Sequence, residues 1–364
     1  MPHPLFLPCQ LGDLTLPNRI VMAPLTRNRA NLDGDTPHSQ HVRYYSQRAG
    51  AGLIISEGAQ ISAEGKGYFR TPGIYTDAQI EAWSAVTDAV HDKGGRMFCQ
   101  LWHTGRVSHT QFQPDGQPPV APSAIRADAQ TFADGGMVDT SMPRALETDE
   151  IPRLVNDYIH AAKCAKAAGF DGVELHGANG YLLDQFFRSS SNQRDDRYGG
   201  SVENRTRILK EALDGLLTVW DGSRIGVRFS PFSHAGGVEP DEPMETFLAA
   251  IARCNSAGVS YVHLVEGETG GERTMEDRQI AVFREAIDGA YMANNGYDRQ
   301  MAMDAVDGGA DLICFGVPYL ANPDLAERLA AGDDLNKPDP DTFYGGGAEG
   351  YVDHPFSVAE PVSA

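Results

Sequence analysis

Short apolar runs alternate with longer amphipathic segments along almost the whole of this chain. Short runs that are apolar at every position are typical of parallel strands buried on both faces. The predicted strands are residues 19–24, 52–57, 96–101, 172–176, 225–229, 259–265, 290–293 and 311–315. The segments between them have helical periodicity, and the predicted helices include residues 76–93, 149–168, 202–219, 244–257 and 299–307.

Glycines follow several of the predicted helices directly before the next strand. They occur at the ends of the segments 93–95, 168–169, 257–258 and 307–309. Glycine adopts the positive φ of a helix C-terminus without steric cost, so these positions mark helix ends. Regular alternation of this kind, with eight strands, favours a closed barrel over an open sheet. The sequence therefore predicts an α/β fold, a (β/α)8 TIM barrel that forms one domain over residues 1–364.

Two internal segments and one terminal segment depart from this alternation. Residues 5–17 carry apolar positions on both sides of a Gly-Asp pair and predict a β-hairpin at the bottom of the barrel. Residues 102–148 are rich in Pro and Gly and follow the third predicted strand. Because barrel active sites lie at the carboxyl ends of the strands, this long connection predicts a cap over the site. Residues 357–364 are expected to form a tail.

Composition excludes several classes of partner. The 364 residues include 30 Lys and Arg against 50 Asp and Glu, a formal charge of −20, which does not suit binding to nucleic-acid phosphates or an anionic membrane. No apolar run reaches the roughly 20 residues of a membrane-spanning helix. The 5 cysteines are far apart and predict single buried thiols, with neither a disulfide framework nor a metal site. We expect a cytoplasmic monomer or homodimer that binds no metal.

Polar side chains gather at the predicted carboxyl ends of the strands. The segment 176–181 is the most informative of these ends. His176 and Asn179 leave one strand end together and can donate hydrogen bonds to the same oxygen. Tyr181 follows, and a phenol with its usual pKa of about 10 remains a proton donor at neutral pH. This set suits a reaction in which a carbonyl oxygen gains negative charge and a nearby carbon gains a proton; a structural histidine beside a loop tyrosine is the alternative interpretation.

Other histidines and one glutamate have structural interpretations. Glu174 lies two residues before His176, so it is expected to point into the barrel near Arg228 in a structural role. His103, His109 and His263 have no evident partner in the sequence and are expected to be structural or exposed.

Ordered motifs extend over most of the chain. They are NRIVMAPLT at 18–26, GLIISE at 52–57, QLWH at 100–103, FDGVELHGANGYLLDQF at 170–186, RDDRYGGSVENR at 194–205, ANPDL at 321–325 and YGGGAEGY at 344–351. With these motifs the sequence resembles the old yellow enzyme family, the FMN-dependent ene-reductases, from about residue 5 to 356.

The resemblance implies FMN at the barrel mouth and NAD(P)H as the reductant. The implied cofactor-binding residues are Pro24, Leu25, Thr26, Gly58, Gln100, Arg228, Asn294, Asn295, Gly316 and Val317. Within this set Gln100 would hydrogen-bond to the pyrimidine edge of the flavin, and Arg228 would stabilise its anionic reduced form. Thr26 would donate to flavin O4 and so take part in catalysis by tuning the potential.

The resemblance also implies a reaction, the NAD(P)H-dependent reduction of activated C=C bonds in α,β-unsaturated carbonyl or nitro compounds. His176 and Asn179 would hold the substrate oxygen while hydride passes from FMN N5 to the β-carbon, and Tyr181 would protonate the α-carbon. Tyr68, Trp102 and Tyr351 would line the substrate pocket.

One position departs from the family pattern. The family usually has F-G-R-P after the eighth strand, with the arginine on the FMN phosphate, whereas this chain has Phe315-Gly316-Val317-Pro318. A charge-assisted hydrogen bond is worth about 1.5–3 kcal/mol, so FMN is expected to bind more weakly here. Backbone N–H groups near 294–295 and 316–317 would cradle the phosphate instead. A nitrate-ester or nitro-compound reductase on the same scaffold, and a flavin-poor binding protein, are the alternative functions.

Overall fold

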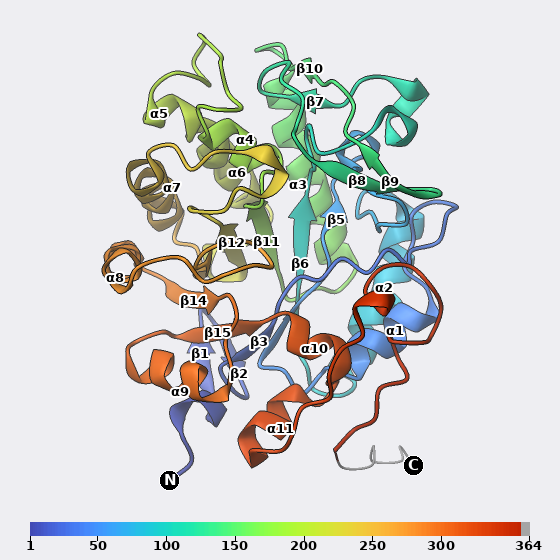
Figure 1. Cartoon of the computed structure of the whole chain (residues 1–364), viewed down its shortest axis with the longest axis vertical. Helices are drawn as coiled ribbons and strands as arrows, with labels where there is room; N and C mark the ends of the chain where they lie inside the picture. The colour runs from blue at the N-terminus through green and yellow to red at the C-terminus, as the bar shows by residue number, and fades with distance from the viewer. Residues whose placement is uncertain (358–364) are drawn as a thin grey trace.

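The computed structural model describes residues 1–357, and a closed parallel barrel lies at its centre (Figure 1). The eight barrel strands are β3 Ile20–Met22, β4 Leu53–Ile55, β6 Met97–Trp102, β11 Gly172–Gly177, β12 Ile225–Phe229, β13 Tyr261–Val265, β14 Ala290–Asn294 and β15 Leu312–Phe315. Pairing of β11 with β6 and of β15 with β3 closes the ring. The predicted (β/α)8 TIM barrel is confirmed.

Helices surround the barrel. Their bounds are α1 Ser39–Ser46, α2 Asp77–His91, α3 Ile151–Ala167, α4 Leu182–Phe187, α5 Val202–Arg205, α6 Arg207–Leu216, α7 Pro243–Ala257, α8 Asp277–Ala286, α9 Arg299–Asp307, α10 Val317–Ala321 and α11 Leu325–Ala331. Helix α2 begins with a reciprocal capping box between Thr76 and Gln79, which satisfies two backbone donors of its first turn.

One predicted helix differs from the structure. The segment 202–219 is divided at Thr206, which has φ −90° and ψ 0° and caps both α5 and α6. The Thr206 hydroxyl donates to the carbonyl oxygen of Val202 at 2.9 Å, and a side-chain bond of this kind competes with regular helical pairing.

Additions cover the two ends of the barrel. Strands β1 Cys9–Leu11 and β2 Leu14–Leu16 form the predicted antiparallel hairpin at the amino-terminal end. Beyond β6, strands β8 Gln130–Ala133 and β9 Gly136–Asp139 pair antiparallel, and β7 Val120–Ala121 pairs with β10 Arg144–Ala145. These strands belong to the segment 102–148 and lie at the end of the molecule opposite the hairpin (Figure 1). Strand β5 Ala59–Gln60 extends the sheet beside β6.

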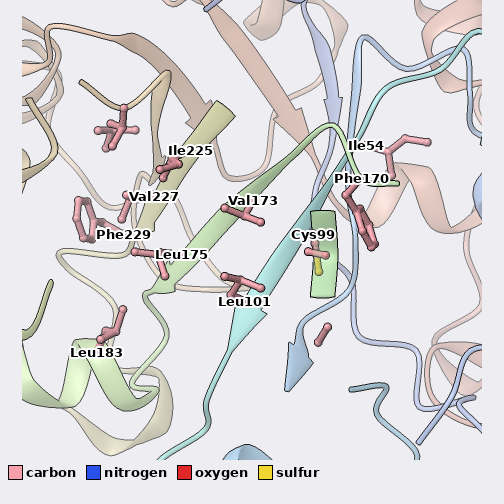
Figure 2. Close-up of a cluster of buried hydrophobic side chains, with 14 of the residues drawn as sticks. Ile54, Cys99, Leu101, Phe170, Val173, Leu175, Leu183, Ile225, Val227 and Phe229 are labelled. Carbon is pink, nitrogen blue, oxygen red and sulfur yellow. The ribbon is translucent and has the colours of Figure 1, made fainter. Parts of the chain in front are cut away.

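The apolar core has two layers, because successive strand residues point to opposite sides of the barrel wall. The outer layer lies between strands and helices and includes Val173 and Leu175 of β11 (Figure 2). The inner layer fills the barrel interior and includes Leu53 and Phe98 together with the hairpin. In β11 the alternate residues, Glu174 and His176, are therefore the ones that point into the barrel.

Two further expectations concern thiols and membranes. All five cysteines are buried and unpaired in the described chain. Among residues 1–357, no helix is both long enough and apolar enough to cross a membrane. The predicted tail lies outside the described residues except for Ser357.

Candidate active site

The carboxyl ends of the barrel strands bring most of the predicted site residues to one mouth. Pro24, Leu25 and Thr26 follow β3 and are half-buried, while Gly58 follows β4 and is buried. Gln100 lies in β6, Arg228 in β12 and Asn294 at the end of β14, whereas Asn295, Gly316 and Val317 directly follow β14 and β15. Parallel strands end at the same edge, so these residues share one end of the barrel.

Four aromatic rings form a single cluster at this mouth. The Trp102 indole stacks on Tyr68 with centroids 5.6 Å apart and on His176 at 6.4 Å. Tyr181 meets the Trp102 ring edge-on at 5.0 Å. Gly58 faces the same indole, and a Cβ there would lie 2.7 Å from it, so only glycine permits this packing. The structure thus brings together four of the predicted catalytic and substrate-binding residues.

His176 is a neutral hydrogen-bond donor. Its side chain is buried, and burial, with the nearby Arg228 charge, holds its pKa well below the usual 6.5. The backbone N–H of Ala178 donates to His176 Nδ1 at 3.3 Å. Because Nδ1 accepts, the ring proton lies on Nε2, which is then the donor of the neutral ring.

Asn179 is held by groups from two other loops, one through its backbone and one through its side chain. Asn179 has φ 61°, and its backbone N–H donates to Ser230 Oγ at 2.7 Å. Thr269 Oγ1 donates to Asn179 Oδ1 at 2.7 Å. With its oxygen engaged, the amide has its N–H groups left to offer to a ligand.

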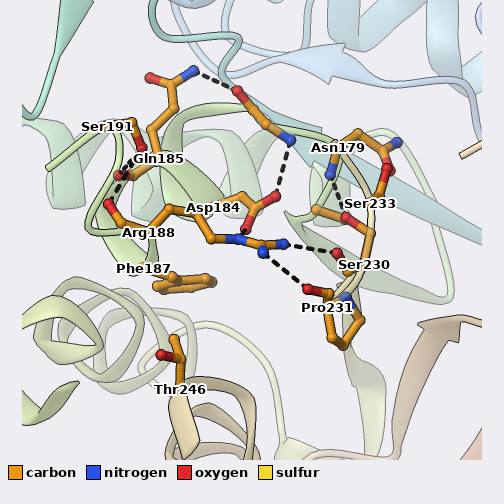
Figure 3. A network of polar contacts seen from close by, with 12 residues as sticks. Asn179, Asp184, Gln185, Phe187, Arg188, Ser191, Ser230, Pro231, Ser233 and Thr246 are labelled. Carbon is orange, nitrogen blue, oxygen red and sulfur yellow. Dashed lines mark hydrogen bonds and ion pairs between the residues drawn. The ribbon is translucent and has the colours of Figure 1, made fainter. Parts of the chain in front are cut away.

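A buried ion pair fixes the loop that carries Asn179 and Tyr181. Gly180 N donates to Asp184 Oδ2 at 2.9 Å, and Arg188 Nε contacts Asp184 Oδ1 at 2.7 Å. The Arg188 guanidinium also donates to the carbonyl oxygens of Ser230 and Pro231, and Figure 3 shows it between the two segments. The loop after β11 is therefore tied to the loop after β12.

Tyr181 is held in its protonated form. Burial raises the pKa of its phenol well above 10, and the neighbouring Tyr68 and Tyr344 raise it further. The Tyr68 and Tyr181 hydroxyls are 3.0 Å apart, and burial raises the pKa of Tyr68 to about 12. Both phenols keep their protons at neutral pH, as a proton donor requires.

Arg228 is a buried cation, and no carboxylate of residues 1–357 contacts it. Its side chain is 7% exposed, and Nη2 donates to Asn294 Oδ1 at 3.3 Å. No described residue accepts a hydrogen bond from Arg228 Nε. Gln100 is buried nearby, with Nε2 donating to Glu174 Oε1 at 2.8 Å, and its own oxygen receives no hydrogen bond from residues 1–357. An unsatisfied buried donor such as Arg228 Nε is costly unless a ligand accepts its hydrogen bond.

Comparison with known proteins places the chain and its fold in one family. The sequence profile of the NADH:flavin oxidoreductase / NADH oxidase family matches residues 4–336. 12-Oxophytodienoate reductase 1 of Oryza sativa subsp. japonica is 44% identical over 361 residues, which are 97% of this chain and 93% of that protein. A probable flavin mononucleotide-dependent alkene reductase of Leishmania infantum is 41% identical over 355 residues, 96% of each chain. A structure of morphinone reductase in complex with tetrahydroNAD has a TM-score of 0.93 at 48% identity and covers 98% of each chain. The chain belongs to the old yellow enzyme family.

Membership of this family confirms the predicted class of activity. The protein is an FMN-dependent NAD(P)H oxidoreductase of the ene-reductase type. The old yellow enzyme homologue from Zymomonas mobilis, 41% identical with a TM-score of 0.92, covers 96% of this chain and 99% of its own. The similarity therefore extends over the barrel and its additions alike.

Tyr351 lies away from the aromatic cluster of this old yellow enzyme family member. Its ring stacks on Tyr44 at 4.2 Å, and the Arg27 and Arg29 guanidinium groups lie 5.0 and 4.5 Å from its centroid. Tyr344, which is 61% exposed, contributes to the raised pKa values of the Tyr68 and Tyr181 phenols. Both tyrosines belong to the motif at 344–351, so the motif alone does not show which of them packs on Tyr44.

The ends of β14 and β15 offer backbone donors where the family pattern would have an arginine. Asn294 pairs with Cys314 across the two strands. Among the described residues no acceptor binds the backbone N–H groups of Asn295, Gly316 and Val317, and the Val317 side chain is half exposed. The amide nitrogens of Asn294 and Asn295 donate to backbone carbonyl oxygens, so the side chains are already engaged.

Proposed function

We propose that this protein reduces the activated C=C bond of α,β-unsaturated carbonyl or nitro compounds at the barrel mouth. One arrangement carries the proposal: neutral His176 and the free amide of Asn179 flank Tyr181, whose pKa is raised well above 10. Two donors beside a protonated phenol suit a reaction that creates an enolate-like oxygen and then protonates carbon.

The unpartnered groups of the mouth match the needs of FMN. Arg228 and Gln100 would hold the pyrimidine edge of the flavin, since a buried cation and a free amide oxygen complement its anionic and N–H groups. Thr26 would meet the same ring from the end of β3, beside Pro24, Leu25 and Gly58. The free backbone N–H groups at 295, 316 and 317 would bind the phosphate.

His176 and Asn179 would bind the substrate oxygen. Bound FMN, reduced by NAD(P)H, supplies the hydride for the β-carbon. As the substrate oxygen gains negative charge, His176 Nε2–H and the Asn179 amide N–H groups stabilise it more strongly than in the ground state, which lowers the barrier.

Tyr181 would give its proton to the α-carbon. Tyr68, with its hydroxyl 3.0 Å from that of Tyr181, would donate a hydrogen bond to the phenolate left behind. The stacked rings of Tyr68 and Trp102 would exclude water on this side and present a flat apolar wall to the substrate.

Colour provides the test. Purified protein that is yellow, bleaches anaerobically with NAD(P)H and recovers its colour with cyclohexenone supports the proposal. Colour that returns only with a nitrate ester would favour a nitrate-ester reductase on the same scaffold. A colourless protein that cannot be reconstituted with FMN would contradict both and favour a binding protein.

A further inference from the structure

A buried carboxylate links three barrel strands beneath the mouth through its hydrogen bonds. Glu174 of β11 is fully buried and lies opposite Gln100 of β6 on one side and Gly226 of β12 on the other. Its Oε1 accepts from Gln100 Nε2 at 2.8 Å. Its Oε2 accepts from Tyr261 Oη at 3.1 Å and from His263 Nδ1 at 2.9 Å, both of β13.

A glycine makes the contact with Tyr261 possible. Tyr261 lies opposite Gly226 in the register of β12 and β13, and its ring crosses β12 to reach Glu174. A Cβ at position 226 would lie 2.0 Å from Tyr261 Cζ, so any larger residue would push the ring away. Because Gly226 has no side chain, the Tyr261 hydroxyl can hydrogen-bond to the Glu174 carboxylate two strands away.

The same carboxylate acts electrostatically on Arg228. Burial lowers the pKa of Arg228, and Glu174 is the first group that opposes this change. None of the described residues forms an ion pair with Arg228, so Glu174 balances its charge from a distance. In the low-dielectric interior such a charge changes the energy of any anion that binds to Arg228.

The carboxylate also sets the orientation of the Gln100 amide. An ionised carboxylate only accepts hydrogen bonds, so Gln100 must present Nε2 to Glu174. The amide oxygen then has no partner among residues 1–357 and is available to a donor at the mouth.

We propose that Glu174 is a positioning residue for the flavin. It fixes the Gln100 amide with its oxygen available to the pyrimidine edge, and its negative charge offsets Arg228 and so limits the stabilisation of the reduced, anionic flavin. This inference rests on the proposed position of FMN beside Gln100 and Arg228.

Two substitutions separate the two roles. Glu174→Gln keeps the shape and an acceptor for Gln100 but removes the charge, so Arg228 should favour the reduced flavin more strongly. We expect the ratio of oxidised to reduced Kd to rise about tenfold, seen as a two-electron midpoint potential about 30 mV more positive in anaerobic dye equilibration. Glu174→Asp keeps the charge but is one methylene shorter, so we expect weaker binding of oxidised FMN with little change in potential.

Glu266→Gln is the matched control. Glu266 is also a buried carboxylate, bound by the hydroxyls of Tyr291 and Tyr297 and paired with Arg273. It lies in the cleft lined by residues of α8 and α9, outside the barrel interior. We expect its loss to change neither FMN affinity nor potential.

The outcomes distinguish this inference from the proposed function. Wild-type protein that binds no FMN would contradict the proposed function. If the wild-type protein binds FMN, an unchanged potential in Glu174→Gln would overturn only the role of Glu174. A shift of equal size in Glu266→Gln would do the same. If Glu174→Gln does not fold, an unchanged FMN Kd in Glu174→Asp overturns the inference.

Discussion

The two ends of the barrel share the same strands but differ in what fills them. At the amino-terminal end, Leu11 and Leu16 of the hairpin pack against inward residues such as Leu53 and are at most 1% exposed. At the carboxyl end, the inward positions are polar, and they include His176 and Arg228.

The difference separates stability from function. Apolar burial at the hairpin end contributes about 25 cal/mol for each Å² removed from water. Buried polar groups without partners cost about 1–3 kcal/mol each, and at the mouth Arg228 Nε, Trp102 Nε1 and His263 Nε2 have none among the described residues. The hairpin end therefore stabilises the barrel, while the carboxyl end retains hydrogen-bond donors for ligands.

The largest effect is expected from Tyr181→Phe at the mouth. General acid catalysis contributes about 10²–10⁴-fold, so alkene reduction by the pre-reduced enzyme should slow by about that factor. Reduction of the flavin by NAD(P)H should be unchanged, and anaerobic stopped-flow absorbance follows both half-reactions. Tyr68→Phe, which keeps the Tyr181 phenol, is the control and should cost less; full alkene reduction in Tyr181→Phe would exclude it as the proton donor.

Leu16→Ala tests the contribution of the hairpin end to stability. Truncation of a fully buried leucine costs about 2–5 kcal/mol, so urea unfolding should show a loss of that size. FMN affinity of the folded protein should remain unchanged. Thr15→Ala, on the exposed face of the same strand, should change stability by less than about 0.5 kcal/mol. A weakened FMN Kd in Leu16→Ala would show that the two ends are coupled.

Val317→Arg adds a cation at the carboxyl end of the barrel. A charge-assisted hydrogen bond to the phosphate of about 1.5–3 kcal/mol should lower the Kd of FMN about ten- to hundredfold, with no such gain for riboflavin. Quenching of flavin fluorescence by the apoprotein measures both constants. Val282→Arg adds the same charge at an exposed valine of α8 and controls for the net charge. Equal FMN affinity in the wild type and both variants would show that position 317 does not face the phosphate.

The smallest effect is expected from pH. Burial raises the pKa of Tyr181 well above 10 and lowers that of His176 well below 6.5. Tyr181 should therefore lose its proton only in strong base, and His176 should gain one only in acid. From about pH 6.5 to 9 the rate constant of alkene reduction by pre-reduced enzyme should vary less than about twofold. A slope near neutral pH would show that another group supplies the proton.

Much of the fold was predictable because strand and helix periods are local properties. The eight strands agree with the apolar runs to within a few residues, and the helix-stop glycines at 94, 169 and 258 have positive φ. The break at Thr206 was missed, since the segment around it keeps its amphipathic pattern.

The site was predictable where a motif and a strand end coincide. His176 and Tyr181 meet Trp102 and Tyr68 because strand ends converge in a barrel. Tyr351 was expected in the pocket, but its ring packs on Tyr44, and the exposed Tyr344 was not foreseen. Sequence distance does not show which of two tyrosines in one loop is buried.

Local sequence patterns were sufficient to predict the barrel, the residue types at its mouth and the family. Which polar groups have hydrogen-bond partners depends on the three-dimensional packing of the strands. Glu174 and His263 were expected to be structural, and no sequence pattern indicated that they bind each other, or that Tyr261 reaches Glu174 through the gap left by Gly226. The physical reason is that alternation along one strand gives a side chain its face, whereas its hydrogen-bond partners come from other strands, far away in the sequence, that only barrel closure brings within reach.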